Sequence, residues 1–332
     1  MKFDFLNNLS LGDMQVSGAM SVIPLIGEDA TNNIASFEDV KFEKTSDYGT
    51  MVFSNKSDKP AILPSGFAIM TKQKAQDHAL VYSTFLKPNS TRSIKNACCI
   101  QQTQCGYIDG KGIKGFNFIP VEIRKNGVSK YTENGNMSFS RLWPLISDFQ
   151  KKLVKEEASN LIFYFNKYMD KLVSYNAEFE CVPKQRGAII LYCNKVVGIE
   201  IVPTHAYWKT IWNPLIRDAY GSTILKMMLS NPVDSFIAKK DETKVLKDVT
   251  SLSEITSSLK SLALQRKLSV FDEINEISET DFTEYKTNME RIDGSTDFNG
   301  TYSLNHKIFK NNKSVGEVIL ENQKIIYFSY LV

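Results

Sequence analysis

The alternation of hydrophobic and polar positions predicts two strong β-hairpins in the C-terminal half of the chain. Apolar residues fill nearly every position of 188–193 and 196–202, on either side of a turn at Asn194-Lys195. Such continuous apolar runs are typical of central strands, which are buried on both faces. A second hairpin is predicted from 315–320 and 324–331. We therefore expect antiparallel pairing to dominate the fold.

Helical periodicity marks two longer regions, in which apolar residues recur every three or four positions. One extends from Phe139 to Met169, as one helix or two, and the other from Tyr207 to Leu229. Because each carries one apolar stripe, both are expected to pack against a sheet. The predicted fold class is α+β, with a predominantly antiparallel β-sheet and two or three long helices packed on one side.

Short apolar runs separated by turn-forming residues predict further strands in the first 110 residues. Pro24, inside the apolar run 20–26, predicts an edge strand or a strand end, because proline has no amide hydrogen for the ladder. The runs 49–54 and 61–64 are joined by Asn, Ser, Asp and Pro residues, which predict an antiparallel hairpin.

The length of 332 residues suggests about two domains, and a single β-rich unit with elaborations is also open. Between 231 and 300 the chain is polar and charged, with one amphipathic helix expected at 252–268. We expect a main β-rich domain with helices over 1–230 and a polar helical connector over 231–300. A closing β-hairpin over 301–332 is expected to return to the main domain.

Composition and charge narrow the classes of partner. Lys and Arg (40) nearly balance Asp and Glu (37), so the chain lacks the positive field that favours nucleic acid. We expect no secretory signal, because the first residues lack its apolar region, and no apolar run approaches the roughly 20 residues that cross a bilayer. We expect a soluble cytoplasmic protein, in the host cytoplasm if the source is viral, without membrane contact.

Cysteine and histidine usage argues against bound metal. The five cysteines are odd in number and include no Cys-x-x-Cys pair, and the three histidines are widely separated. This pattern is typical of reduced thiols and not of a disulfide framework or a zinc site. We therefore expect no metal site, and nothing in the sequence indicates a cofactor.

The stretch 48–108 concentrates the candidate site groups. A polar segment at 72–78 is followed by a strand and then by Cys98-Cys99 and several amides. An imidazolium from His78 beside one of these cysteines would lower the thiol pKa and create a nucleophile. Free cysteine is more often a small buried hydrophobe, and we favour core packing for this pair.

The order of motifs resembles one known domain family. A hairpin ends in Pro64-Ser65-Gly66, the pair Gln76-Asp77 follows, and a later strand carries Cys99-Ile100-Gln101-Gln102 before the two C-terminal hairpins. This order is similar to the domain named for its association with ADP-ribosylglycohydrolases and rhodanese-phosphatase proteins. The similarity runs through most of the chain and is weakest from 231 to 296.

Members of that family carry a Gly-Gly-Lys-Gln-Asp-Arg-like segment and, on the next strand, a Cys-Val-Glu-Gln-Gly-Arg-Trp-like segment. The resemblance aligns them with 74–78 and 99–105, and an alternative register places the Lys-Gln pair at Lys72-Gln73. The residues that keep the pattern are Gln76, Asp77, Cys99 and Gln102.

Several positions depart from the family pattern. Ala75 stands where a lysine is expected, His78 replaces an arginine, Gln101 replaces a glutamate, and the Gly-Arg-Trp triplet is absent. Histidine lacks the bidentate fork with which arginine holds an anion. These departures bring any inherited activity into question.

The resemblance implies a role around ADP-ribose or nucleotide-derived metabolites, in conflict between phage and host. Our first hypothesis is a binding domain that recognises a small nucleotide-derived, ADP-ribose-like ligand or a protein partner without turnover. The predicted ligand-binding residues are Lys72, Gln73, Gln76, Asp77, His78, Cys99, Gln101 and Gln102.

Two alternatives stay open. One is an enzyme that hydrolyses a glycosidic or phosphoester bond of an ADP-ribose-like compound, with Asp77 as base. The other is a structural or interaction protein of a phage, which contacts a partner or its own copies through 231–296. The sequence does not decide between binding and catalysis.

Overall fold

The computed structural model describes residues 6, 8–71, 75–113, 115–134, 138–155, 159–230, 270, 272–277, 283–285, 291–295 and 301–332. Antiparallel strands dominate these residues, and helices pack beside them, which confirms the predicted α+β class. The helices are η1 (Phe37–Asp39), α1 (Val121–Asn134), α2 (Trp143–Gln150), α3 (Leu161–Asn176), α4 (His205–Pro214), η2 (Leu215–Gly221) and α5 (Ser222–Ser230).

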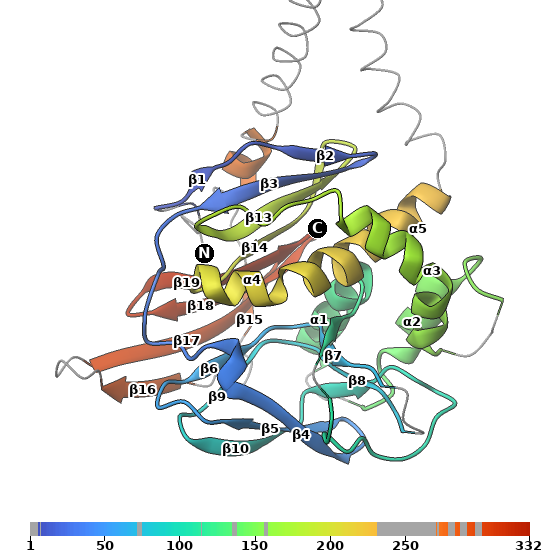
Figure 1. Ribbon diagram of the computed structural model, residues 1–332, viewed down its shortest axis with the longest axis horizontal. Helices are drawn as coiled ribbons and strands as arrows, with labels where there is room; N and C mark the ends of the chain where they lie inside the picture. Colours follow the sequence, from blue (N-terminus) through green and yellow to red (C-terminus); the bar gives the residue numbers. More distant parts are fainter. Residues whose placement is uncertain are drawn as a thin grey trace, which may run out of the picture.

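One large antiparallel sheet forms the backbone of the fold (Figure 1). Its order is β1-β3-β13-β14-β19-β18-β17-β15, with β2 beside β3 and β16 beside β17. The strands are β1 (Ser10–Leu11), β2 (Gln15–Ser17), β3 (Met20–Ile26), β13 (Gln185–Tyr192), β14 (Lys195–Ile201), β15 (Thr283–Tyr285), β16 (Arg291–Ser295), β17 (Thr301–Lys310), β18 (Val315–Glu321) and β19 (Lys324–Leu331). Both predicted hairpins are present, as β13–β14 and β18–β19, and they meet where β19 pairs with β14.

Three smaller sheets are built from the chain between 40 and 118. Their orders are β10-β5-β4, β11-β8-β7-β12 and β6-β9. The strands are β4 (Val40–Asp47), β5 (Thr50–Asn55), β6 (Ala61–Leu63), β7 (Phe67–Ile69), β8 (His78–Leu80), β9 (Thr84–Leu86), β10 (Ser90–Ile94), β11 (Ala97–Cys99) and β12 (Asn117–Phe118).

The predicted hairpin between 49–54 and 61–64 is wrong. β5 pairs with β4 and β10, whereas β6 pairs with β9 in another sheet. The side-chain amide of Asn55 donates hydrogen bonds to the carbonyls of Lys59 and Lys87, at 2.8 and 3.1 Å. These bonds tie the connecting loop to the end of β9, so the chain changes sheets instead of folding back along β5.

The prediction of an edge strand around Pro24 also needs correction. β3 lies between β13 and the short strands β1 and β2, so it is not at the rim. Pro24 faces the interval between β1 and β2, where its carbonyl accepts a hydrogen bond from the Gly12 N–H (2.8 Å). Proline has no amide hydrogen to donate, and on this side of β3, between β1 and β2, no described strand pairs at Pro24 to accept one.

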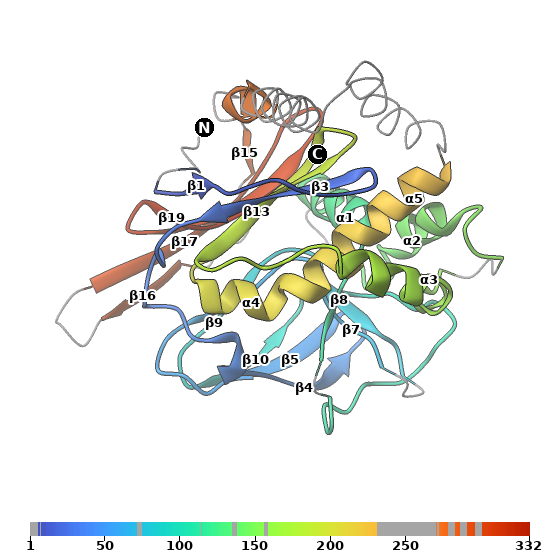
Figure 2. The same cartoon turned by 45° about the horizontal axis from the view of Figure 1, so that its top comes forward.

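The long helix expected from 207 to 229 is present as α4, η2 and α5, which run on without a break (Figures 1 and 2). It begins where the Thr204 side chain accepts a hydrogen bond from the Tyr207 N–H (3.1 Å), a typical N-cap. The region predicted at 139–169 forms two helices, α2 and α3. Helix α1 was not predicted, because its mostly polar sequence shows no clear apolar stripe.

Helices α1 and α4 lie between the large sheet and the smaller sheets, and α2 and α3 lie to one side of them (Figures 1 and 2). One apolar cluster joins Ile190 of β13, Trp208 of α4 and Phe67 of β7. Neighbouring β13 residues such as Ile189 face the other side of the large sheet and pack with Ile274, in the helical segment 272–277. This alternation follows from the two-residue period of a strand.

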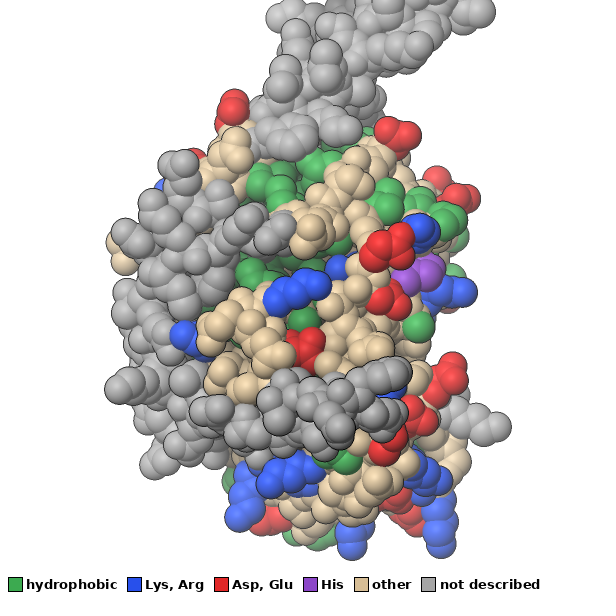
Figure 3. All heavy atoms as spheres, turned by 90° about the vertical axis from the view of Figure 1, so that its left-hand side faces the viewer, with side chains coloured by type: hydrophobic (Ala, Val, Ile, Leu, Met, Phe, Trp, Pro, Cys, Tyr) green, Lys and Arg blue, Asp and Glu red, His purple; other side chains and the backbone are tan. Residues whose placement is uncertain are grey.

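Within the described residues, no helix has both the length and the hydrophobicity needed to cross a bilayer. Acidic and basic side chains are interspersed on the face shown in Figure 3. The helix expected at 252–268, and most of the connector expected at 231–300, lie outside the described residues.

Candidate functional site

The two predicted polar segments lie side by side. β8 pairs with β11, and His78 is directly opposite Cys99. Just beyond the paired residues, the Ile100 N–H donates to the Asp77 carbonyl (2.9 Å), and the Asp77 N–H donates to Oε1 of Gln101 (3.2 Å). The strand register thus brings together Asp77, His78, Cys99 and Gln101, all of which are buried.

His78 and Cys99 form a neutral hydrogen-bonded pair. Nε2 of His78 accepts from the Gly49 N–H (3.2 Å) and lies 3.3 Å from the Cys99 sulfur, while Nδ1 lies 2.8 Å from the Gln76 carbonyl. Because a carbonyl can only accept, Nδ1 carries the proton and Nε2 is the acceptor. Burial lowers the pKa of His78 and raises the pKa of Cys99 to about 12. Cys99 is therefore a thiol at neutral pH, and this pair does not supply a nucleophile.

Asp77 and Gln76 each bury an oxygen without a partner. Oδ1 of Asp77 accepts from the Thr71 N–H (2.9 Å), but Oδ2 has no hydrogen-bond partner among the described residues. The same is true of Oε1 of Gln76. Burial raises the pKa of Asp77 to about 7, against the lowering effect of the Thr71 bond. A carboxyl group in this state is a candidate acid or base.

The remaining predicted residues have other positions. Gln102 is exposed, and its Oε1 accepts a hydrogen bond from the Ser159 N–H (3.2 Å). Lys72 and Gln73 lie outside the described residues. The structure therefore places five of the eight predicted residues in one buried cluster, one at the surface beside it, and leaves two undescribed.

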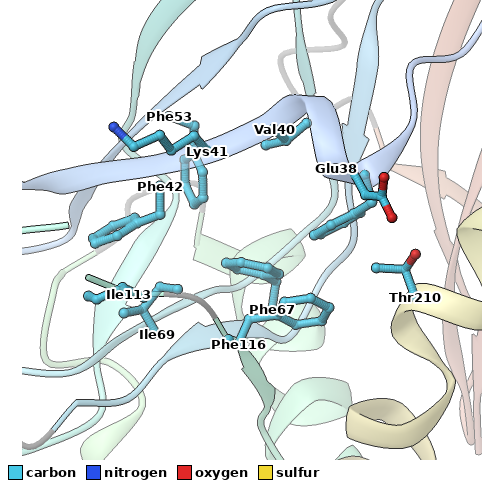
Figure 4. Close-up of a pocket in the computed structure, with 12 residues that line it drawn as sticks. Glu38, Val40, Lys41, Phe42, Phe53, Phe67, Ile69, Ile113, Phe116 and Thr210 are labelled. Carbon is cyan, nitrogen blue, oxygen red and sulfur yellow. The ribbon is translucent and has the colours of Figure 1, made fainter. Parts of the chain in front are cut away.

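A pocket of about 350 Å³ lies between β7 of this sheet and strands β4 and β5 of the neighbouring sheet (Figure 4). We call it the Phe pocket. Ile69 of β7 lines it, and Ile69 is also the residue paired with His78, so the pocket adjoins the predicted segments. Its lining residues are Phe37, Glu38, Val40, Lys41, Phe42, Phe53, Phe67, Ile69, Ile113, Gly115, Phe116 and Thr210.

Local structure explains why aromatic rings gather here. β4 places Phe42 inward and Lys41 outward, and Phe116 packs against Phe67, with ring centroids 5.0 Å apart. The short helix η1 adds Phe37, whose ring centroid also lies 5.0 Å from that of Phe116. The polar residues Glu38 and Thr210 lie at one end (Figure 4).

The family comparison agrees with the order of motifs. The model of the ARG and Rhodanese-Phosphatase-superfamily-associated Protein domain matches residues 8–295. The chain belongs to this family. No curated protein and no solved structure matches it significantly.

This member of the ARG and Rhodanese-Phosphatase-superfamily-associated family also contains a buried ionic network that sequence reasoning missed. Arg124 of α1 is 1% exposed and forms an ion pair with Glu200 of β14. Its guanidinium also donates to Oγ of Ser65 (2.8 Å) and of Ser329 (2.7 Å), and the Tyr220 hydroxyl donates to Glu200 (2.9 Å). Burial acts to lower the pKa of Arg124, but Glu200, Tyr327 and Tyr220 together outweigh burial and raise it.

A second buried pair lies beside this network. His306 of β17 bonds Glu317 of β18 (2.9 Å), whose carboxylate also accepts from the Ser83 N–H (2.7 Å). Burial acts to raise the pKa of Glu317, but the bond with His306 and the charge of Arg124 lower it. The Arg124–Glu200 and His306–Glu317 pairs are both hydrogen-bonded, and they link the large sheet to α1 and to the smaller sheets. This arrangement indicates a structural role. A polar helix with one arginine gives no sequence signal for such a contact.

Proposed function

We propose that this chain is a binding domain for a small nucleotide-derived ligand, and that it does not turn the ligand over. In this proposal the Phe pocket holds the planar ring of the ligand, and the rest of the ligand lies outside the mouth. The observation that carries the proposal is the pocket itself, a concave site of about 350 Å³ walled by phenylalanine rings.

The size and lining of the Phe pocket support this occupant. Ligand sites typically enclose about 300–1,000 Å³ and combine an apolar wall with a few placed polar groups. Stacking of a nucleic-acid base on an aromatic side chain contributes about 1–3 kcal/mol. A protein partner fits less well, because a standard interface needs about 800 Å² from each side.

The chemistry of the lining supports binding without turnover. Among the described residues that line the Phe pocket, Glu38 is the one carboxylate, and there is no histidine or cysteine. Glycoside hydrolysis typically requires two carboxyl groups that face each other across the scissile bond. The nearby His78 and Cys99 are committed to each other in a neutral hydrogen bond.

One observation favours the enzyme as a second candidate. Asp77 has an unpartnered Oδ2 and a pKa raised to about 7, which suits a general base. Asp77 is fully buried, so substrate would have to reach it through a change in the surrounding chain. Under this alternative, Asp77→Asn abolishes turnover without a matching loss of affinity.

Calorimetry with ADP-ribose, nicotinamide adenine dinucleotide and cyclic nucleotides tests the first proposal. Phe116→Ala removes a half-buried wall of the pocket and is expected to weaken binding about 10-fold or more. Phe139→Ala is the matched control, because Phe139 is an exposed phenylalanine (38%) outside the pocket. Equal losses in both variants, or no binding to the wild type, would contradict the proposal.

Turnover is tested separately by chromatography of the same mixtures after overnight incubation. We expect every nucleotide to be recovered unchanged. Protein-dependent release of a base or a phosphate would replace the binding proposal with the enzyme alternative, and loss of that release in Asp77→Asn would identify the base.

A further inference from the structure

The charged groups at the Phe pocket are unequal. Glu38 and Lys41 both line it, but Nζ of Lys41 is held by the Glu43 carboxylate at 2.7 Å. In Figure 4 the Lys41 nitrogen points away from the rings, whereas the Glu38 carboxylate lies at the pocket's end beside Thr210. Among the described lining residues, the charge directed at a ligand is therefore negative.

Backbone structure holds Glu38 in this position. It is the central residue of helix η1, where its N–H donates to the side chain of Ser36, the N-cap. Phe37, the preceding residue, is 7% exposed and packs edge-on against Tyr207 of α4, with ring centroids 5.5 Å apart. The buried ring anchors the short helix, which sets where the Glu38 side chain leaves the backbone.

The aromatic wall has the same electrostatic preference. The face of a phenylalanine ring is the negative part of its quadrupole and attracts a cation. Phe37, Phe67 and Phe116 contact one another around the pocket, with ring centroids 5.0 to 5.9 Å apart. An aromatic wall next to a carboxylate is the combination that recognises a flat or compact cation.

We propose that the Phe pocket selects a planar ring with a positive charge, such as the pyridinium of an oxidised nicotinamide nucleotide. This proposal rests on the proposed function and specifies which end of the ligand enters the pocket. The anionic phosphates would then lie outside the mouth, away from Glu38. A neutral ring of the same shape would bind more weakly, and an anionic ring more weakly still.

Three probes of one shape separate charge from size. They are 1-methylnicotinamide (cationic), nicotinamide (neutral) and nicotinate (anionic), each titrated against the full chain by ligand-observed NMR. A cation over aromatic faces is expected to bind about 2- to 30-fold tighter than the neutral probe. The preference should shrink as salt is added, because the carboxylate's contribution is screened.

Glu38→Gln tests the carboxylate, and its exposed position means that the variant should fold. We expect the preference for 1-methylnicotinamide over nicotinamide to fall at least twofold. Asp39→Asn removes the same charge one residue along, outside the pocket lining, and should keep the preference. Phe116→Ala should weaken all three probes.

The outcomes distinguish this inference from the proposed function. Equal affinities for the three probes, tighter binding of nicotinate, or no saturable binding of 1-methylnicotinamide would overturn the charge preference. If nucleotides still bind in calorimetry and Phe116→Ala weakens them, the binding function stands and only the choice of ring fails. If neither nucleotides nor probes bind, both proposals fail.

Discussion

The protonation of Asp77 should make the stability of the fold depend on pH in a way that one substitution removes. Asp77 is fully buried, one of its oxygens lacks a partner among the described residues, and burial raises its pKa from 3.8 to about 7. The folded state therefore holds this proton more tightly than the unfolded state. Between about pH 4 and 7 folding takes up a proton, so the free energy of unfolding falls as the pH rises.

Asp77→Asn keeps an oxygen for the Thr71 N–H and cannot ionise. A pKa difference of about three units corresponds to about 4 kcal/mol across the full window, at about 1.36 kcal/mol per unit. Most of it, roughly 3 kcal/mol, falls between about pH 4.5 and about pH 8. We expect the variant to gain this much stability relative to the wild type as the pH is raised.

Urea unfolding of both proteins at the two pH values measures the effect. Other groups, such as Glu317, titrate in both proteins and cancel in the difference between them. A difference in unfolding free energy that is the same at both pH values would show that Asp77 is ionised throughout, which would refute the buried-acid reasoning. A gain at high pH would indicate that the carboxyl is kept at the expense of stability, as at functional sites.

Three further predictions concern the rest of the structure. Arg124→Met leaves a buried carboxylate uncompensated and should cost about 3–5 kcal/mol in urea unfolding. Gly198→Ala places a Cβ 2.3 Å from the Tyr220 hydroxyl oxygen, so we expect a loss of about 1–3 kcal/mol and a lower Tm by calorimetry. Iodoacetamide at mildly alkaline pH should label the exposed Cys105 quickly and leave Cys99 unmodified, because Cys99 is buried and its thiol pKa is raised. Mass spectrometry identifies the labelled cysteine. Rapid labelling of Cys99 in the folded protein would contradict this assignment.

The parts of the fold that the sequence predicts are those with strong periodicity. The hairpin β13–β14 and the helix that begins at His205 bury their apolar residues in repeating positions, so pattern and structure agree. The hairpin's turn is at Cys193-Asn194, one residue before the predicted position. Helix α1 shows no such periodicity, because its fully buried residue Arg124 is charged and bonds residues of distant strands. A contact of this kind has no local signature.

The candidate site likewise has one feature that the sequence predicts and others that it does not. The strand order correctly brings Asp77 next to Gln101, because adjacent strands with a defined register place these residues together. Their burial was not predictable, because it depends on the chain that covers them. The Phe pocket was missed altogether, since Phe37, Phe67 and Phe116 come from three separate segments and each alone resembles a core residue.

The central claim is that the Phe pocket holds the ring of a nucleotide-derived ligand, and the most direct test is where that ring binds. A crystal structure of the full chain with nicotinamide adenine dinucleotide should show the ring against Phe67 and Phe116, with the phosphates outside the mouth. A ring found between β8 and β11, or at any surface away from these phenylalanines, would contradict the account.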